Sequence, residues 1–173
     1  DYIRKLVDDC DNVQGFIMNH SVGGGTGSGL GALILERLAI DYRKKCKFDF
    51  EIYSDSDPQN AIQAYNRLLS MHWTMDNSKL SMVFDNRKLQ NICRDRLLIE
   101  AQSYDDINSR IAKHVSTMTG SMRFEGEVNV DMNEFVTNLI PFPRLHYLIS
   151  AMAPIIASDR NKQGGVERRK ILI

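Results

Sequence analysis

A cluster of glycines at residues 23–29 is the part of this sequence best suited to chemistry. It reads Gly-Gly-Gly-Thr-Gly-Ser-Gly, with five glycines in seven residues. Because glycine has no Cβ, the backbone can approach an anion closely, and its N–H groups can hold a phosphate at the start of a helix. A plain flexible turn needs only one or two glycines, so the density of this cluster favours phosphate binding.

The flanking residues place this cluster, the glycine segment (residues 23–29), between a strand and a helix. Residues 15–19 predict a short buried strand. In residues 30–42, apolar side chains recur at helical spacing on one face and predict a helix. A loop between a strand and a helix is the context that phosphate binding requires.

Two phosphate motifs can be compared with the glycine segment. A Walker A loop is excluded, because no Lys-Ser or Lys-Thr pair closes the segment. Gly27, Gly29 and Ala32 satisfy the looser pattern G-x-G-x-x-A of dinucleotide-binding enzymes. On this alternative the chain is a Rossmann-type oxidoreductase that binds NAD, with Asp55 or Asp57 at the ribose.

Strand and helix patterns alternate along the rest of the chain. Residues 48–53 alternate apolar and polar side chains, as a half-buried strand does. Ser103 and Asp106 fit a capping box, so a helix is expected to begin near residue 103. The alternation predicts an α/β fold with a mostly parallel sheet and helices on both faces. Helices are expected at residues 2–10, 30–42, 62–69, 89–97, 103–118 and 131–139, and strands at 15–19, 48–53, 80–84 and 145–151.

The composition is that of one ordinary globular domain. The chain has 173 residues, and 22 basic against 22 acidic side chains give a net charge of zero, which offers no attraction to nucleic acid or anionic membranes. Its three cysteines are odd in number and widely spaced, so we expect free thiols in a reducing compartment. No apolar run approaches the ~20 residues that span a bilayer, and a cytoplasmic location is expected. Because the sequence does not begin with Met, we expect part of a longer protein.

Four stretches of the sequence resemble the tubulin family. The segment HSVGGGTGSG is similar to the signature loop of that family, and three further segments resemble the α-type chain. The resemblance is continuous from residue 1 to about residue 158. The four stretches are residues 20–29, 35–53 (LERLAIDYRKKCKFDFEIY), 84–94 (FDNRKLQNICR) and 121–135 (SMRFEGEVNVDMNEF).

The resemblance implies a domain layout and a role. Residues 1–120 would be part of a Rossmann-like tubulin GTPase domain, and residues 121–173 the start of the second, intermediate domain with a basic tail. The protein would be a structural subunit of microtubules in the cytoplasmic cytoskeleton. It would bind GTP and Mg²⁺ and polymerise head to tail with a β-type tubulin.

The resemblance also implies residues for the GTP site, whereas the Mg²⁺ ligands stay unknown. Asn86 and Asn108 would hydrogen-bond the guanine edge, for which the amide offers a donor and an acceptor. Tyr104 would stack on the base. From the residues alone, Asn86 can also be a helix N-cap and Tyr104 a core aromatic. The phosphate-contacting positions would be Ser21, Gly23, Gly24, Gly25, Thr26 and Gly27.

Glu134 is the residue on which catalysis is expected to depend. Asp131 and Glu134 are three residues apart on a predicted helix and would share a face. In α-type tubulins the matching glutamate projects towards the nucleotide of the next subunit and activates water there. Glu134, with Asp131, is therefore the expected catalytic group of a GTPase that acts across a subunit contact.

Three departures from the tubulin pattern indicate a divergent chain, and the first two support an alternative role. Residues 54–60 lack the usual proline-rich sequence, and Gln63 stands where an acidic residue commonly meets the ribose. Residues 141–147 are closer to β-type and minor tubulins. The alternative is a tubulin-like subunit that caps or decorates filaments and binds nucleotide poorly.

Overall fold

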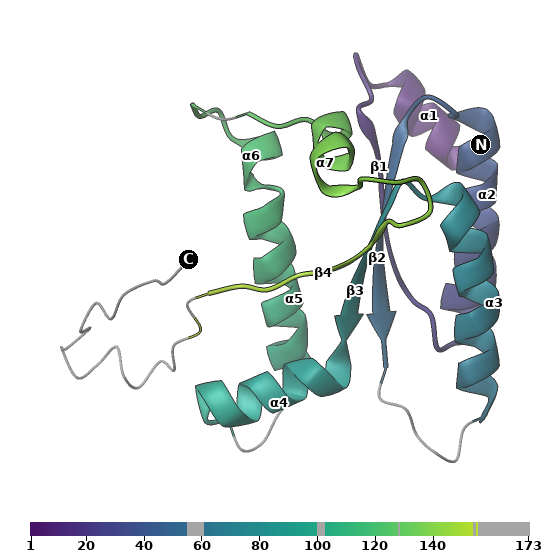
Figure 1. Ribbon diagram of the computed structural model, residues 1–173. Helices are drawn as coiled ribbons and strands as arrows, with labels where there is room; N and C mark the ends of the chain where they lie inside the picture. The colour runs from purple at the N-terminus through teal and green to yellow at the C-terminus, as the bar shows by residue number, and fades with distance from the viewer. Residues whose placement is uncertain (55–60, 100–102, 128, 154, 156–173) are drawn as a thin grey trace.

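The computed structural model describes residues 1–54, 61–99, 103–127, 129–153 and 155 of the chain. Helices and strands alternate through most of this part (Figure 1). In chain order the elements are α1 (Tyr2–Asp8), β1 (Gly15–Ser21), the π-helical turn η1 (Thr26–Leu30), α2 (Gly31–Asp41), β2 (Cys46–Tyr53), α3 (Ala61–Asn77), β3 (Leu80–Asp85), α4 (Asn86–Leu97), α5 (Tyr104–Met118), α6 (Gly120–Arg123), α7 (Met132–Leu139) and β4 (Tyr147–Ile149).

The four strands form one sheet in the order β1-β2-β3-β4, and every pair is parallel. Figure 1 shows α1, α2 and α3 on one side of the sheet and α5 and α7 on the other. Parallel strands need crossovers, and the crossover helices cover both faces. The predicted α/β fold, a parallel sheet with helices on both faces, is confirmed.

One face of the sheet carries the hydrophobic core. Cys46, Phe48 and Phe50 alternate along β2 and cluster with Leu80, Met82, Phe84 and Met132. Apolar side chains of α5 and α7 pack against this cluster, and the ring centroids of Phe48 and Phe135 lie 6.3 Å apart. At about 25 cal/mol per Å² of apolar area, this burial is the main term that stabilises the fold.

The alternation in β2 had predicted a strand with one solvent-exposed face, and that prediction is wrong. Lys47, Asp49 and Glu51 lie on the face opposite the core, and all three are buried. The reason is that α2 and α3 cover this face, so the polar side chains of β2 lie inside the protein.

Several predicted boundaries differ from the observed ones. β1 runs two residues beyond the predicted strand and includes His20 and Ser21. The helix after the glycine segment begins at Thr26, in η1, so only residues 23–25 form a loop. α3 extends to Asn77, and the short helix α6 was not expected. The capping box of Ser103 and Asp106 is confirmed at the start of α5.

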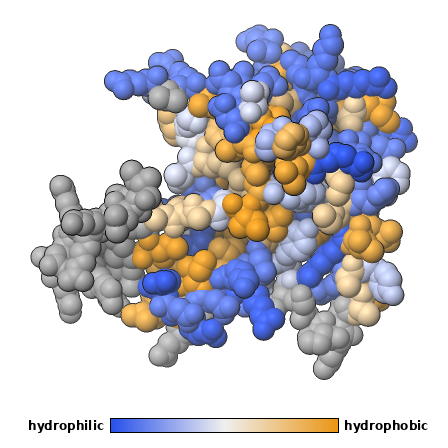
Figure 2. Space-filling view, in the orientation of Figure 1, coloured by the Kyte–Doolittle hydropathy of each residue, from blue (hydrophilic) through white to orange (hydrophobic). Residues whose placement is uncertain are grey.

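The surface of the described part combines charged residues with many exposed apolar ones. Figure 2 shows apolar surface over α7 and the segment that follows it, where Leu139, Phe142 and Leu145 are exposed. All three cysteines are free thiols, as expected, with Cys46 and Cys93 buried. Among the described residues, no helix has the length and apolar character needed to span a bilayer.

Candidate functional site

The glycine segment is folded tightly onto the end of β1. A Cβ on Gly27 would overlap the carbonyl oxygen of Ser21, so only glycine allows η1 to pack against the strand. A Cβ on Gly24, Gly25 or Gly29 would instead meet no atom within 4 Å. Packing therefore requires a glycine at position 27, whereas Gly24, Gly25 and Gly29 leave open space beside the backbone.

The backbone N–H groups at the start of η1 suit an anion. Gly25 is the N-cap of η1 and supplies no capping side chain, so the first N–H groups of the helix have no intrahelical acceptor. Those N–H groups and the positive end of the helix dipole favour negative charge. Ser28 holds the turn in shape, because its hydroxyl donates to the Gly24 carbonyl oxygen at 2.7 Å and its N–H donates to the same oxygen at 3.0 Å. This cradle fits the phosphate group predicted from the sequence.

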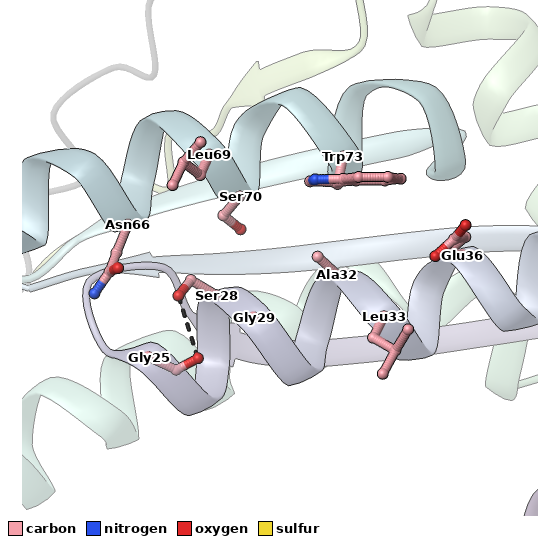
Figure 3. A pocket seen from close by; sticks show the side chains of 10 residues that line it. All are labelled: Gly25, Ser28, Gly29, Ala32, Leu33, Glu36, Asn66, Leu69, Ser70 and Trp73. Atoms are coloured by element: carbon pink, nitrogen blue, oxygen red, sulfur yellow. Dashed lines mark hydrogen bonds between the residues drawn. The ribbon is translucent and has the colours of Figure 1, made fainter.

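A groove of about 440 Å³ lies beside the glycine segment, between α2 and α3 (Figure 3). Asn66 of α3 donates to the Gly23 carbonyl oxygen at 3.0 Å and joins α3 to the glycine segment at this end. Ser70 is buried, and its hydroxyl has no partner among the described residues. The sequence analysis did not find this groove, because its lining comes from helices about 40 residues apart in the sequence.

Three further predicted site residues lie at the same edge of the sheet as the glycine segment. Asn86 is the first residue of α4, directly after β3, and Tyr104 and Asn108 lie in the first turns of α5 (Figure 1). The structure brings them to the carboxyl ends of the strands, the edge at which open α/β sheets bind ligands. No hydrogen bond joins any of the three to another in the described part of the chain.

The simpler structural roles of Asn86 and Tyr104 do not hold. Asp85, not Asn86, is the N-cap of α4, and its carboxylate accepts from the N–H groups of Arg87 and Lys88. Tyr104 is 74% exposed and is not a core aromatic. The Asn86 Oδ1 atom is buried, and no hydrogen-bond partner for it lies within the described residues. An unpaired buried oxygen is costly, so it is a natural acceptor for a ligand N–H.

Asp131 and Glu134 form a capping box, which the sequence analysis had not assigned to them. Asp131 is the N-cap of α7 and accepts from the Glu134 N–H at 2.7 Å, while Glu134 Oε2 accepts from the Asp131 N–H at 3.3 Å. Asp131 lies one residue before the observed helix, and the two reciprocal bonds keep its side chain next to that of Glu134. The two residues lie at the N-terminal end of α7, at the end of the sheet opposite the glycine segment (Figure 1).

A buried polar cluster lies directly beneath the glycine segment. The His20 ring bonds to the Gly27 carbonyl oxygen through Nδ1 at 2.7 Å and to Asp49 Oδ2 through Nε2 at 3.1 Å, with Asp49 Oδ1 2.9 Å away. Glu51 lies beside Asp49 on the same strand face and accepts from the Tyr53 hydroxyl at 2.9 Å. The sequence analysis had given none of these side chains a role.

His20 and Glu51 in this cluster have displaced pKa values. Burial alone would lower the pKa of His20, but the hydrogen bond and charge of Asp49 outweigh it and raise that pKa above its usual value. Burial, followed by the charge of Asp49, raises the pKa of Glu51. The sequence held one signal for this buried cluster, because Asp49 and Glu51 are acidic residues in a strand of a sheet expected to have helices on both faces.

The described residues do not form a metal site. Among them, no group of three or more His, Cys, Asp or Glu side chains is placed to hold a metal ion. Asp55 and Asp57, and most of the residues 54–60 that depart from the tubulin pattern, lie outside the described residues. The expected Mg²⁺ therefore has no ligand set in this part of the chain.

Comparisons with known proteins show the family to which the chain belongs. Residues 1–94 match the model of the Tubulin/FtsZ family, GTPase domain. The chain belongs to this family. The match spans β1, the glycine segment and Asn86, so it covers the candidate phosphate cradle and the first of the residues expected at the base. Because the chain belongs to this family, the alternative of an NAD-binding oxidoreductase no longer applies.

Within the family the chain is similar to α-type tubulins. It is 47% identical to the tubulin alpha-1 chain of Emericella nidulans and 48% identical to the tubulin alpha-A chain of Neurospora crassa, over 92% and 93% of its length. The tubulin alpha-1B chain of Physarum polycephalum is 44% identical over 92% of this chain. In each case the match covers 36% of the relative, so this tubulin-like chain spans about a third of the length of these proteins.

Proposed function

We propose that this chain carries the GTP site of a tubulin subunit. The glycine segment and Ser21 hold the phosphates, with the N–H groups of residues 23–27 as donors. Asn86 and Asn108 hydrogen-bond the guanine edge, and Tyr104 stacks on the base. The uncapped start of η1 supports the phosphate assignment, and the unpaired buried Oδ1 of Asn86 supports the base assignment.

The proposed subunit polymerises head to tail with a β-type tubulin in microtubules of the cytoplasmic cytoskeleton. Glu134 then acts on the nucleotide of the neighbouring subunit. As a general base, its carboxylate accepts a proton from the water that attacks the γ-phosphate, and GDP and phosphate are the products. Asp131 holds Glu134 at the start of α7 through the capping box.

The observation that carries this proposal is the separation of the two groups along the sheet. The phosphate cradle lies at the carboxyl ends of the strands, and Glu134 lies at the amino ends (Figure 1). A carboxylate at the opposite edge cannot reach the nucleotide of its own subunit. In a head-to-tail stack, however, the opposite edges of successive subunits meet.

The test uses the whole protein that contains this chain, purified with its native partners and denatured to release bound nucleotide. Chromatography should find about one guanine nucleotide per chain. The absence of nucleotide in freshly isolated protein would refute the GTP-site proposal.

A second candidate, a subunit that caps or decorates filaments, is favoured by Gln63. Its side chain lies 3.9 Å from the position of a Cβ on Gly23, and its Oε1 accepts from Arg67 at 3.5 Å. A neutral amide there provides a weaker acceptor for a ribose hydroxyl than a carboxylate does. Nucleotide-free protein that still bound tubulin would support this candidate over the first.

A further inference from the structure

The hydrogen bonds of His20 fix the number of protons at this site. The Nδ1 atom faces the carbonyl oxygen of Gly27, and Nε2 faces the carboxylate of Asp49. A peptide carbonyl oxygen and a carboxylate both accept hydrogen bonds and donate none. A neutral imidazole has only one N–H, so it can satisfy only one of these acceptors. Both hydrogen bonds form when the ring carries a proton on each nitrogen, as an imidazolium. If the proton between Nε2 and Asp49 resides on the carboxylate instead, the pair of side chains still holds the same number of protons.

The backbone around His20 leaves the ring little room to turn. A Cβ on Gly31 would lie 3.0 Å from Nδ1, so α2 packs directly over the ring. Asp49 is fully buried, and His20 is 9% exposed. Solvent water therefore cannot replace a lost hydrogen bond. Because the bond to the charged Asp49 is the stronger one, the remaining N–H stays on Nε2, and a missing proton leaves the Nδ1 lone pair facing the Gly27 carbonyl oxygen.

We propose that His20 is a positioning residue that holds the glycine segment in its phosphate-binding shape, and that it does so only while the pair of His20 and Asp49 carries the extra proton. The bridge runs from Asp49 on β2 through His20 on β1 to Gly27 in η1. Gly27 also packs on Ser21, so its carbonyl is tied to the turn that presents the N–H groups. This inference rests on the proposed function for its effect on nucleotide, but the bridge itself can be tested without nucleotide.

The charged groups around the ring favour the protonated state. Asp49 and Glu51, both on β2, raise the pKa of His20 through their charge. The turn η1 has no titratable side chain. The helices over this face carry charged side chains as well. Glu36 of α2 lines the groove, and Arg67 of α3 lies 5.6 Å from the centroid of the Tyr53 ring. His146, directly before β4, and Tyr147, on β4, feel the charge of Asp49, and burial raises the pKa of Tyr147 to about 12.

The sign of the pH dependence follows from this arrangement. Because the folded-state pKa of His20 is raised, the bridge is complete at low pH and is lost as the pH rises through that raised value. The glycine segment should then loosen at alkaline pH. Loss of one charge-assisted hydrogen bond corresponds to about a tenfold change in the opening equilibrium of the segment.

Hydrogen–deuterium exchange of the whole protein, from pH 6 to 8.5, tests the proposal. The readout is the exchange of the peptide at residues 21–30, divided at each pH by that of the same peptide in the unfolded chain. Wild-type protection should fall about tenfold as the pH rises, and His20→Gln should show low protection that does not change with pH. The matched control His72→Gln, at an exposed histidine on α3, should retain the wild-type profile.

Two further variants identify the titrating group. Asp49→Asn removes the charge that favours the imidazolium and should move the transition to lower pH. Glu51→Gln should retain the transition, and its disappearance would assign the titration to Glu51 and overturn the proposal. A wild-type profile that is flat, or one that His20→Gln does not alter, would also overturn it.

Nucleotide retention, measured in parallel, separates this inference from the proposed function. Loss of bound guanine nucleotide should follow the loosening of the segment with rising pH. If no nucleotide is present at any pH while the exchange profile behaves as expected, the GTP proposal fails and the His20 bridge stands. If nucleotide is bound and the profile is flat, the bridge fails and the GTP proposal stands.

Discussion

Glu134 and Gly27 lie at opposite ends of β1. The Met132 side chain, two residues before Glu134, contacts Gly15 at the first residue of the strand, and Gly27 packs on the carbonyl of Ser21 at the last. Six residue steps of a parallel strand span roughly 20 Å. The two groups can therefore serve one nucleotide only if they come from different subunits.

Substitution of Glu134 should separate hydrolysis from binding. Glu134→Ala should lower GTP hydrolysis in the polymer by about a hundredfold or more, because the general base is lost, while the nucleotide content of the unpolymerised protein stays the same. The measurement is phosphate release during assembly. Glu125→Gln, at an exposed carboxylate near the same edge, is the control and should hydrolyse GTP at the wild-type rate. Equal rates in Glu134→Ala and the control would remove Glu134 from the mechanism.

Alanine substitutions in the glycine segment should differ sharply in effect. Gly27→Ala forces a Cβ into the Ser21 carbonyl and should cost about 1–3 kcal/mol of stability along with the bound nucleotide. Gly29→Ala meets no atom and lies within η1, where alanine is the better helix former, so stability should rise by up to about 1 kcal/mol. Thermal unfolding and nucleotide content measure both effects. Similar losses in the two variants would contradict the packing described for Gly27.

Removal of the Asn86 amide should weaken guanine binding without loss of stability. Because the buried Oδ1 atom has no partner among the described residues, Asn86→Ala breaks no hydrogen bond at that oxygen in the nucleotide-free protein. The affinity for guanine nucleotide should fall about tenfold, as for one lost hydrogen bond in a buried site. Asn91→Ala, on the same helix but bonded to Arg94, is the control and should leave affinity unchanged. Competition binding with GTP and ATP gives both the affinity and the base selectivity.

Glu51 should make the protein less stable as the pH rises. Its folded-state pKa is raised by burial and by Asp49, so the native state binds the proton more tightly than the unfolded state does. Stability is then full below the unfolded pKa of about 4.5 and is lost as the pH rises towards the folded value, by about 1.4 kcal/mol for each pKa unit of the difference. Glu51→Gln should therefore be more stable than wild type at pH 7 and lose this advantage near pH 4. Urea unfolding at both pH values measures the difference, and an advantage at pH 4 as large as at pH 7 would rule this account out.

Local sequence patterns predicted most of the fold. The helical spacing of apolar residues located α2 and α5, and the Ser103 and Asp106 pair located the start of α5. The glycine segment was correctly placed between a strand and a helix, although the helix begins inside it at Thr26. Such features depend on neighbours within a few residues, which is why the sequence reveals them.

The sequence by itself determined the order of most strands and helices and the position of the glycine segment between a strand and a helix, because periodicity, capping and missing Cβ atoms act locally. Only the tertiary structure decided that Asp49 and Glu51 are buried, since their burial depends on α2 and α3 covering the second face of the sheet. It also decided the partner of His20, which is 29 residues away in the sequence. Hydrogen bonds and loss of solvent between distant segments arise from packing, and packing is a property of the whole folded chain.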